Sequence, residues 1–251
     1  MAPTMECTVK VQLLQLRAAL GAVLPHAKRT KTGEDVAIHR VRLTLANGSM
    51  FVSATNGTTT AIARVAYAGP DGDSRGNLWE PEDGPIVFDM LPAEVRLART
   101  WLQPKAVGDD ADMLVSLTTV RGGESEWEAI GTQNEGSRHT FAGMEISDSF
   151  PDLVELHGRA VAEAPGETSR SRDLVQDGAT VALFKAASVE YRTPLAWRPT
   201  GGDDGGFVVQ CTSAFVGTVA SDTGGDEGKR RRAQDTQTML NILNPRSVAI
   251  A

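Results

Sequence analysis

Residues able to do chemistry are scattered along this 251-residue chain and form no recognisable catalytic pattern. The sequence contains no phosphate-binding loop with its lysine, no His-Glu-x-x-His zinc motif and no Cys-x-x-Cys pair. The four histidines, His26, His39, His139 and His157, are far apart. We therefore expect a protein that is not an enzyme and that uses no cofactor. A hydrolase whose catalytic residues meet only in the folded chain is the enzymatic alternative.

Two further features could bind a metal ion or form a disulfide bond. Asp109, Asp110 and Asp112 offer carboxylates, but the stretch lacks the glycine and the terminal glutamate of a calcium-binding loop, so we interpret it as a solvated turn. Cys7 and Cys211 fall inside apolar runs that predict strands, which favours buried free thiols. The sequence therefore predicts no metal site and no redox chemistry.

Positive side chains are the remaining candidates. The chain has 25 basic and 32 acidic residues, a net charge of −7, which at first argues against a nucleic-acid partner. The position of the charges matters more than their sum. Residues 26–31 place Lys28, Arg29 and Lys31 directly after a predicted helix. They form either a phosphate-contacting loop or a solvated loop whose cations are stabilised by the helix dipole.

The elements that would position these residues begin with an alternating strand at residues 7–11. Leu13, Leu16 and Leu20 then recur at helical spacing and predict an amphipathic helix. Three alternating segments follow as strands, at residues 38–45, 50–55 and 61–67. Asn47-Gly48 and Asn56-Gly57 join them, since Asn-Gly accepts the positive φ of a tight hairpin turn. The predicted order is strand, helix, strand, strand, strand.

The same order repeats along the chain after the Gly-, Pro- and Asp-rich connection at residues 69–84. A strand at 85–88 leads into a helix, with Asp89 as a possible cap and Pro92 in its first turn. The expected later elements are strands at 113–119, 127–132, 140–146 and 159–163, a helix at 173–189, and strands at 193–198, 206–211 and 214–221. The repeat predicts an α+β fold, with helices on one face of antiparallel sheets. We place one domain at residues 1–157 and a second, shortened domain at 158–251.

Three stretches resemble the bacterial DNA polymerase III β subunit, the DNA sliding clamp. The run 52–65 is similar to the first hairpin of that family, with Thr55-Asn56 near the position of its Thr-Asp turn. Residues 149–153, which include Phe150-Pro151-Asp152-Leu153 and follow a glycine-then-basic strand at 136–141, are similar to its exit from the first domain. The helix opening at 89–95 also fits. The resemblance covers residues 5–157.

The resemblance implies a non-enzymatic processivity factor that encircles duplex DNA without reading its sequence and tethers a polymerase. A clamp loader is a further implied partner. Sliding clamps of six half-domains per chain close as dimers and those of four close as trimers, so a chain of this length favours a trimer. We expect a cytoplasmic homo-oligomer with no membrane contact. The alternative is a clamp-fold interaction protein that binds a replisome component or a host clamp without forming its own ring.

A ring that slides must offer phosphates Lys, Arg, Gln and Thr side chains without base-specific geometry. The candidate DNA-binding positions, on or beside the three predicted helices, are Lys28, Arg29, Lys31, Arg96, Arg99, Gln103, Lys185 and Arg192. By resemblance, Arg29 lies near a basic pore position of the family. Each of these side chains could equally be an ordinary surface residue. Partner peptides are expected, by analogy with two-domain clamps, near the connector at residues 153–169.

The C-terminal region leaves two alternatives open. Residues 224–232 are a charged segment, either a solvated loop or a nucleic-acid contact. Residues 237–243 form either a terminal strand or helix, or a segment that resembles the short Gln-x-x-Leu peptides by which clamp partners dock.

Overall fold

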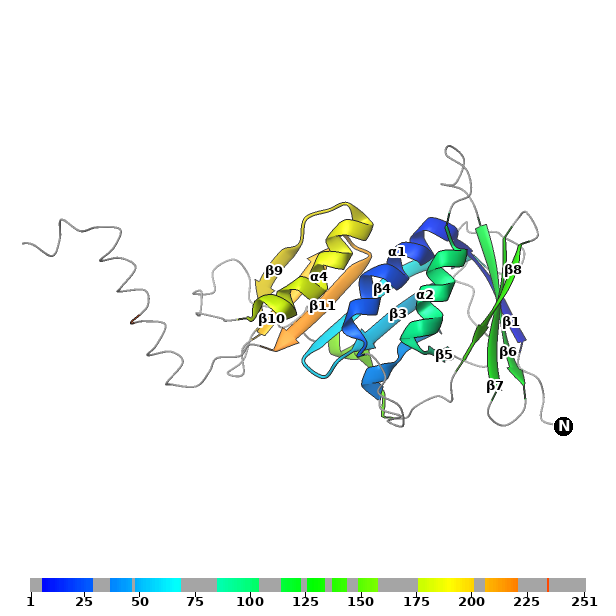
Figure 1. The fold of residues 1–251 in the computed structure, drawn as a ribbon, viewed down its shortest axis with the longest axis horizontal. Coiled ribbons are helices and arrows are strands. Elements are labelled where there is room, and N and C mark those ends of the chain that lie inside the picture. The colour runs from blue at the N-terminus through cyan, green and yellow to red at the C-terminus, as the bar shows by residue number, and fades with distance from the viewer. Residues whose placement is uncertain are drawn as a thin grey trace, which may run out of the picture.

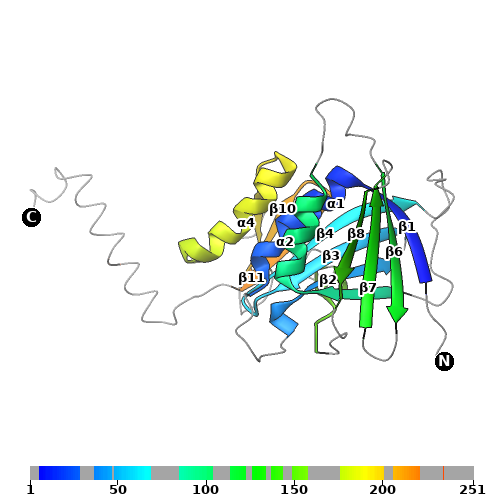
Figure 2. The same cartoon turned by 45° about the vertical axis from the view of Figure 1, so that its right-hand side comes forward.

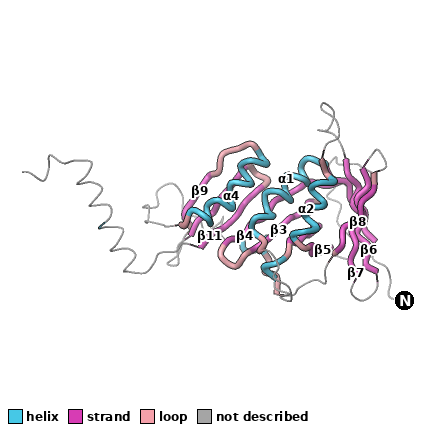
Figure 3. The backbone as a smooth tube through the Cα atoms, in the orientation of Figure 1, coloured by secondary structure: helices cyan, strands magenta, loops and turns pink. Residues whose placement is uncertain are grey.

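The computed structural model describes residues 6–28, 37–46, 48–68, 85–103, 114–122, 126–133, 137–143, 149–157, 176–200, 206–220 and 234. Three helices lie in a row on one side of the strands (Figure 1). Figure 3 shows this separation by colour, with the helices in cyan in front of the magenta strands. The α+β arrangement predicted from the sequence is confirmed.

The chain repeats one order of elements, and we call each repeat a unit. The first unit contains β1 (Glu6–Gln12), α1 (Leu13–Val23), β2 (Val41–Ala46), β3 (Ser49–Thr55) and β4 (Thr59–Ala68), with 3-10 turns at Leu24–His26 and Ala37–His39. The second contains β5 (Ile86–Met90), α2 (Pro92–Trp101), β6 (Leu114–Gly122), β7 (Glu126–Gln133) and β8 (Arg138–Ala142). The third contains α4 (Gly178–Tyr191), β9 (Ala196–Pro199), β10 (Gly206–Cys211) and β11 (Phe215–Ala220). Its predicted first strand, at 159–163, lies outside the described residues.

The first two units exchange their first strands. The strands follow one continuous order, in which we call β5-β2-β3-β4 the first sheet and β1-β6-β7-β8 the second, so each is completed by a strand of the other unit. The two are joined because β1 also pairs with β4, at Lys10 opposite Ala68 and Val11 opposite Tyr67. Figure 2 shows the second sheet, with β6 and β7 in green, standing across the end of the first. The last strand of the third unit, β11, pairs antiparallel with β4, from Phe215 opposite Ala63 to Val219 opposite Thr59. The third unit therefore extends the first sheet.

The hairpin between β3 and β4 forms where the sequence predicts it, but its turn is longer. Strand pairing ends at Thr55 opposite Thr60, which leaves four residues in the loop. Gly57 has a φ of 89°, a conformation that only glycine adopts readily. The Asn56 side chain accepts hydrogen bonds from the backbone N–H groups of Thr58 (2.9 Å) and Thr59 (2.7 Å). This side-chain turn takes the place of a two-residue tight turn.

Several predicted boundaries move for local reasons. Residues 37–39 form a 3-10 turn and not the start of a strand, because the Ile38 carbonyl accepts a hydrogen bond from the Lys28 N–H (2.8 Å). The helix expected at 173–189 begins at Gly178, because Asp177 caps it by accepting a bond from the Thr180 N–H (2.8 Å). The strand expected at 140–146 is β8, which pairs with β7 over residues 138–142.

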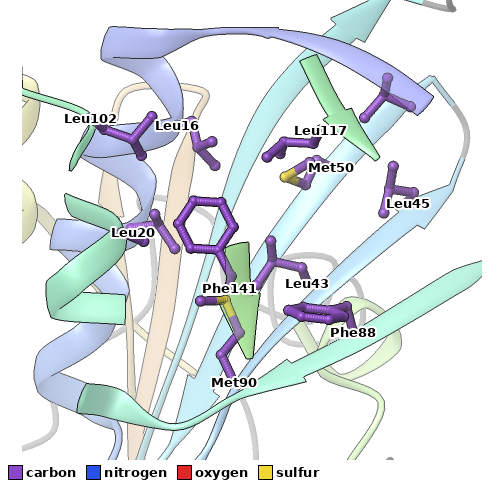
Figure 4. Close-up of a pocket in the computed structure, with 12 residues that line it drawn as sticks. Leu16, Leu20, Leu43, Leu45, Met50, Phe88, Met90, Leu102, Leu117 and Phe141 are labelled. Carbon is purple, nitrogen blue, oxygen red and sulfur yellow. The ribbon is translucent and has the colours of Figure 1, made fainter. Parts of the chain in front are cut away.

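The core lies between α1, α2 and the two sheets, where apolar side chains from both units meet (Figure 4). It encloses an apolar cavity of about 20 Å³, lined by Leu16 and Leu20 of α1, Ala98 of α2 and Phe141 of β8, among others. A cavity this small and apolar offers no ligand site. On the other side of α1, α4 packs through the fully buried Phe184 and Ala187.

Candidate nucleic-acid interface and connector groove

We call α1, α2 and α4 the helix layer, and one glutamate ties its three members together. Glu190 of α4 lies 3.9 Å from a guanidinium nitrogen of Arg17 on α1 and also accepts a hydrogen bond from Arg99 on α2. The pair with Arg99 crosses directly over Gly21, where an added Cβ would stand 2.5 Å from Glu190 Oε1. Glycine at position 21 therefore makes room for an ion pair that spans α1.

The charge of the helix layer differs in sign from that of the chain. The helices carry four cations, Arg17, Arg96, Arg99 and Lys185, against two anions, Glu94 and Glu190, so their net charge is +2. The whole chain has a net charge of −7. A positive layer on an acidic protein concentrates attraction for polyanions at that face.

The structure distributes the predicted DNA-binding residues unevenly. The exposed members are Lys28, Arg96, Gln103, Lys185 and Arg192. Arg96 and Lys185 project from helices, whereas Arg192 is the left-handed residue (φ 50°) that ends α4. Arg99 is held in the ion pair with Glu190. Arg29 and Lys31 lie outside the described residues, as does the acidic stretch at 109–112. The assignment of these side chains to DNA stays a prediction.

Apolar residues share the exposed surface of the helix layer with these cations. Leu14, Leu97, Val181 and Val189 are between 38% and 62% exposed. A surface that mixes few cations with apolar side chains offers a polyanion only weak attraction and no geometry for reading bases.

Asp89 has a structural role that the sequence interpretation missed. The predicted helix cap is wrong, because the residue before α2 is Leu91 and no side chain caps that helix. Asp89 is instead fully buried and accepts hydrogen bonds from Arg42 Nε (2.7 Å), Arg42 Nη2 (2.9 Å) and Arg40 Nη1 (3.0 Å). One carboxylate thus binds two guanidinium groups, which compensates its own burial. The three residues lock β5 onto β2.

Arg42 links this buried cluster to the segment 149–157, which we call the connector. Its guanidinium carbon lies 4.4 Å from the centre of the Phe150 ring, a cation–π contact. After Pro151, residues 153–157 form a short helix, and Asp152 accepts a hydrogen bond from the Glu155 N–H (3.0 Å) at its start. Arg42 thus fixes where the connector leaves the sheet.

His157, at the end of the connector, links it by hydrogen bonds to β4 of the first unit and, through β4, to β11 of the third unit. Its Nδ1 lies 2.7 Å from the Leu153 carbonyl oxygen and therefore donates, so its Nε2 accepts from Thr60 Oγ1 of β4 (3.0 Å). Thr60 Oγ1 is in turn 2.6 Å from Thr218 Oγ1 of β11. Burial lowers the pKa of His157 to about 4, so the ring is neutral at physiological pH. Sequence spacing gives no signal for this contact.

His26 is a second buried histidine near the same junction, on the helix side of the sheet. Its Nδ1 lies 3.0 Å from Thr59 Oγ1, and its ring packs edge-on against Phe184 with centroids 4.6 Å apart. Burial lowers the pKa of His26 to about 3. The residue is a neutral part of the packing between α1 and α4 and not an exposed phosphate ligand.

The connector divides a groove on the sheet face opposite the helix layer. Along β3, Met50, Val52 and Ala54 face the helices, so Phe51 and Ser53 face the groove. One part, of about 310 Å³, lies between the connector and the β10–β11 turn, and we call it the connector groove; its lining includes Phe51, Ile62, Val154, Phe215 and Val216. The other part, of about 360 Å³, lies between the connector, β2, β3 and β5. A groove of this size, mostly apolar, can hold a few side chains of a peptide.

Other kinds of site are missing from the part of the chain that the structure describes. No group of three His, Cys, Asp or Glu side chains could hold a metal ion there. Cys211 is buried beside the carbonyl oxygens of Thr193 and Ala187, and burial raises the pKa of its thiol, so it is unreactive. No described helix is long and apolar enough to cross a membrane.

Comparison with known proteins finds similarity in structure alone. The sequence matches no protein-family model and no curated protein. The solved structures that resemble it include the DNA polymerase III β subunit of Pseudomonas aeruginosa (TM-score 0.54, 12% identity, 86% of this chain and 66% of that one). They also include the β subunit of Thermotoga maritima (TM-score 0.54, 12% identity, 86% and 64%) and the sliding clamp of Bacillus subtilis (TM-score 0.51, 9% identity, 85% and 63%).

These matches show that the chain has the sliding-clamp fold, as its sequence motifs indicated. The chain spans slightly less than two thirds of the length of the clamps that it resembles. The division into domains at residue 157 stays a prediction.

Proposed function

We propose that this protein is a sliding-clamp-like processivity factor, which encloses duplex DNA as a homo-oligomer and tethers replication proteins to it. The observation that carries the proposal is that the two faces of one sheet differ: one bears positively charged helices and the other an apolar groove. The helix layer has a net charge of +2 on a chain of −7, and the connector groove lies on the reverse face. One face then meets DNA while the other receives a partner.

The DNA side of the proposal needs attraction without fixed contacts. The exposed cations Arg96 and Lys185 stand on different helices and attract phosphates without the bidentate geometry that would read a base. Glu190 neutralises part of the charge of Arg17 and Arg99, which keeps the attraction weak. Weak contact suits a protein that must move along DNA, since each tight phosphate contact would add to the cost of a step.

The partner side of the proposal is a short peptide with apolar side chains. Phe51, Val154 and Val216 supply apolar walls to the connector groove, and its volume of about 310 Å³ fits two or three such side chains. DNA polymerase and a clamp loader are the proposed sources of the peptide. Val154 is 42% exposed, so the peptide can reach it without local unfolding.

Charge reversal on the helix layer tests the DNA side. We expect Arg96→Glu combined with Lys185→Glu to lower affinity for duplex DNA at least about tenfold at low salt, because two attractive sites become repulsive. Arg64→Glu combined with Arg198→Glu makes the same change of charge and is the matched control, since Arg64 lines the connector groove and the exposed Arg198 is hydrogen-bonded to Gln210 on that face. Equal loss of affinity in the control, or no loss in the double variant, would contradict the proposal.

A second candidate function is favoured by the exposed apolar side chains of the helix layer. Leu14, Leu97 and Val189 are unusual on a surface that should slide along a polyanion. In this alternative the protein has the clamp fold but binds a replisome component without forming a ring. It predicts DNA binding that is insensitive to the helix-layer charge reversal.

A further inference from the structure

Among the described residues that line the connector groove, Arg64 of β4 is the only one with a charged side chain, because the low pKa of His157 keeps that ring neutral. Arg64 is exposed and forms no ion pair with any residue that the structure describes. Its Nε donates a hydrogen bond to Ser49 Oγ of β3 (2.8 Å). A guanidinium that is held at Nε and open at both Nη groups is arranged to receive an anion.

Strand register determines which side chains stand beside Arg64. It lies opposite Phe51 of β3, and its backbone N–H donates to the carbonyl oxygen of Ala214 (2.7 Å). Two positions along β4, on the same face, Ile62 lies opposite Val216 of β11. Two residues of a strand span about 7 Å. The groove therefore offers a cation and an apolar patch at a fixed separation.

We propose that the connector groove selects peptides in which an acidic residue stands two positions from an apolar residue, and that Arg64 binds the acidic side chain. In an extended peptide, side chains two positions apart point the same way and lie about 7 Å apart, which matches the spacing of Arg64 and Ile62. A carboxylate can accept from both Nη groups at once, whereas a neutral amide cannot match this charge-assisted pair. The inference rests on the proposed function and adds to it the chemistry of the partner.

The carboxylates of the connector do not reverse this preference. Asp152 lines the other part of the groove, and its side chain accepts a hydrogen bond from the Glu155 N–H. Neither Asp152 nor Glu155 is among the described residues that line the connector groove. A basic peptide side chain would meet Arg64 as a like charge. The charge of the groove thus favours an acidic peptide over a basic one.

A phage library of short random peptides, selected first on the wild-type protein, tests the preference. We expect the enriched sequences to carry Asp or Glu two positions from Leu, Ile, Phe or Met. Selection on Arg64→Glu should replace the acidic residue by Lys or Arg at the same position, because the variant reverses the charge of the groove. Enriched sequences without an acidic residue at this spacing, or the same sequences from both selections, would overturn the proposal.

Calorimetric titration with one selected peptide measures the size of the effect. Arg64→Gln should bind this peptide about five- to tenfold more weakly than the wild type, because a charge-assisted pair is lost. A peptide with glutamine in place of the acidic residue should bind both proteins equally. Arg64→Glu should recover affinity with a peptide that carries lysine there, a result that also shows the variant to be folded. Arg138→Gln, which removes an exposed arginine of β8, is the matched control and should bind as the wild type does.

Val154→Asn separates this inference from the proposed function. It removes an apolar wall of the groove without changing its charge, so it should weaken every peptide that binds there, acidic or not. Peptides that respond to Val154→Asn but not to Arg64→Gln would overturn the acidic preference and leave the groove as the partner site. A library that yields no peptide, or peptides that respond to neither variant, would overturn both. Arg64→Gln should leave affinity for DNA unchanged, since the residue lies on the face opposite the helix layer.

Discussion

Replacing Glu190 by glutamine tests whether the helix layer is the surface that meets DNA. The change removes one negative charge, so the net charge of the three helices rises from +2 to +3. It also releases Arg17 and Arg99, which both pair with this carboxylate. The three side chains are 17% to 29% exposed, so losing the pairs costs about 0.5–1 kcal/mol of stability and leaves the fold intact.

The expected gain in DNA binding follows from counterion release. Two more arginines in contact with phosphates make the slope of log affinity against log salt steeper by about 1.8, at roughly 0.9 per contact. Over a fourfold rise in salt, from about 50 to 200 mM, the advantage of the variant over the wild type then shrinks by about twelvefold. The variant should bind more tightly at the low end of this range.

Fluorescence anisotropy of a labelled duplex across a salt series measures both quantities. Glu155→Gln is the matched control, because it makes the same change of charge on the connector at the opposite face. The reasoning is refuted if Glu190→Gln shows the wild-type slope, or if the control variant gains as much affinity.

The remaining predictions concern the joints between elements. Asp89→Asn leaves the buried Arg40 and the half-buried Arg42 without their carboxylate and should cost about 3–5 kcal/mol in urea unfolding; a cost below about 1 kcal/mol would contradict the buried cluster. The folded pKa of His157, about 4, lies below the unfolded value of 6.5, so this residue makes stability fall as pH drops between them, by up to about 1.4 kcal/mol per pH unit. His26, with a pKa of about 3, adds a similar slope, so His157→Gln should lower the slope of the urea midpoints by about half; an unchanged slope would argue against it. Gly217→Ala would place a Cβ 2.5 Å from the Phe184 ring, so we expect a loss of about 1–3 kcal/mol at the β4–β11 joint, and a melting temperature equal to the wild type would count against that packing.

Local patterns predicted most elements because each depends on neighbours in sequence. The alternation in residues 61–67 assigned Ala61, Ala63 and Val65 to the face that the structure buries. The spacing of Leu13, Leu16 and Leu20 likewise identified the buried stripe of α1. The repeated order of elements then led to the fold.

Long-range partners could not be predicted in the same way. Nothing near β1 or β5 signals that these strands are exchanged between units, since strand pairing at such distance leaves no local trace. Asp89 has the sequence position of a helix cap, and only the fold brings it to two arginines of the neighbouring strand. Glu190 pairs with arginines of two other helices, α1 and α2, which belong to the other predicted domain.

Retention on closed DNA tests the central claim, that the protein encloses a duplex, most directly. The protein is first allowed to assemble from dilute solution in the presence of nicked circular DNA. The mixture is then brought to high salt, which removes electrostatic binding, and finally the DNA is linearised. An enclosing ring predicts protein that stays on the circle in high salt and is lost when the circle is cut. If the protein dissociates at high salt from circular DNA as readily as from linear DNA, that result would contradict enclosure and favour the clamp-fold interaction protein.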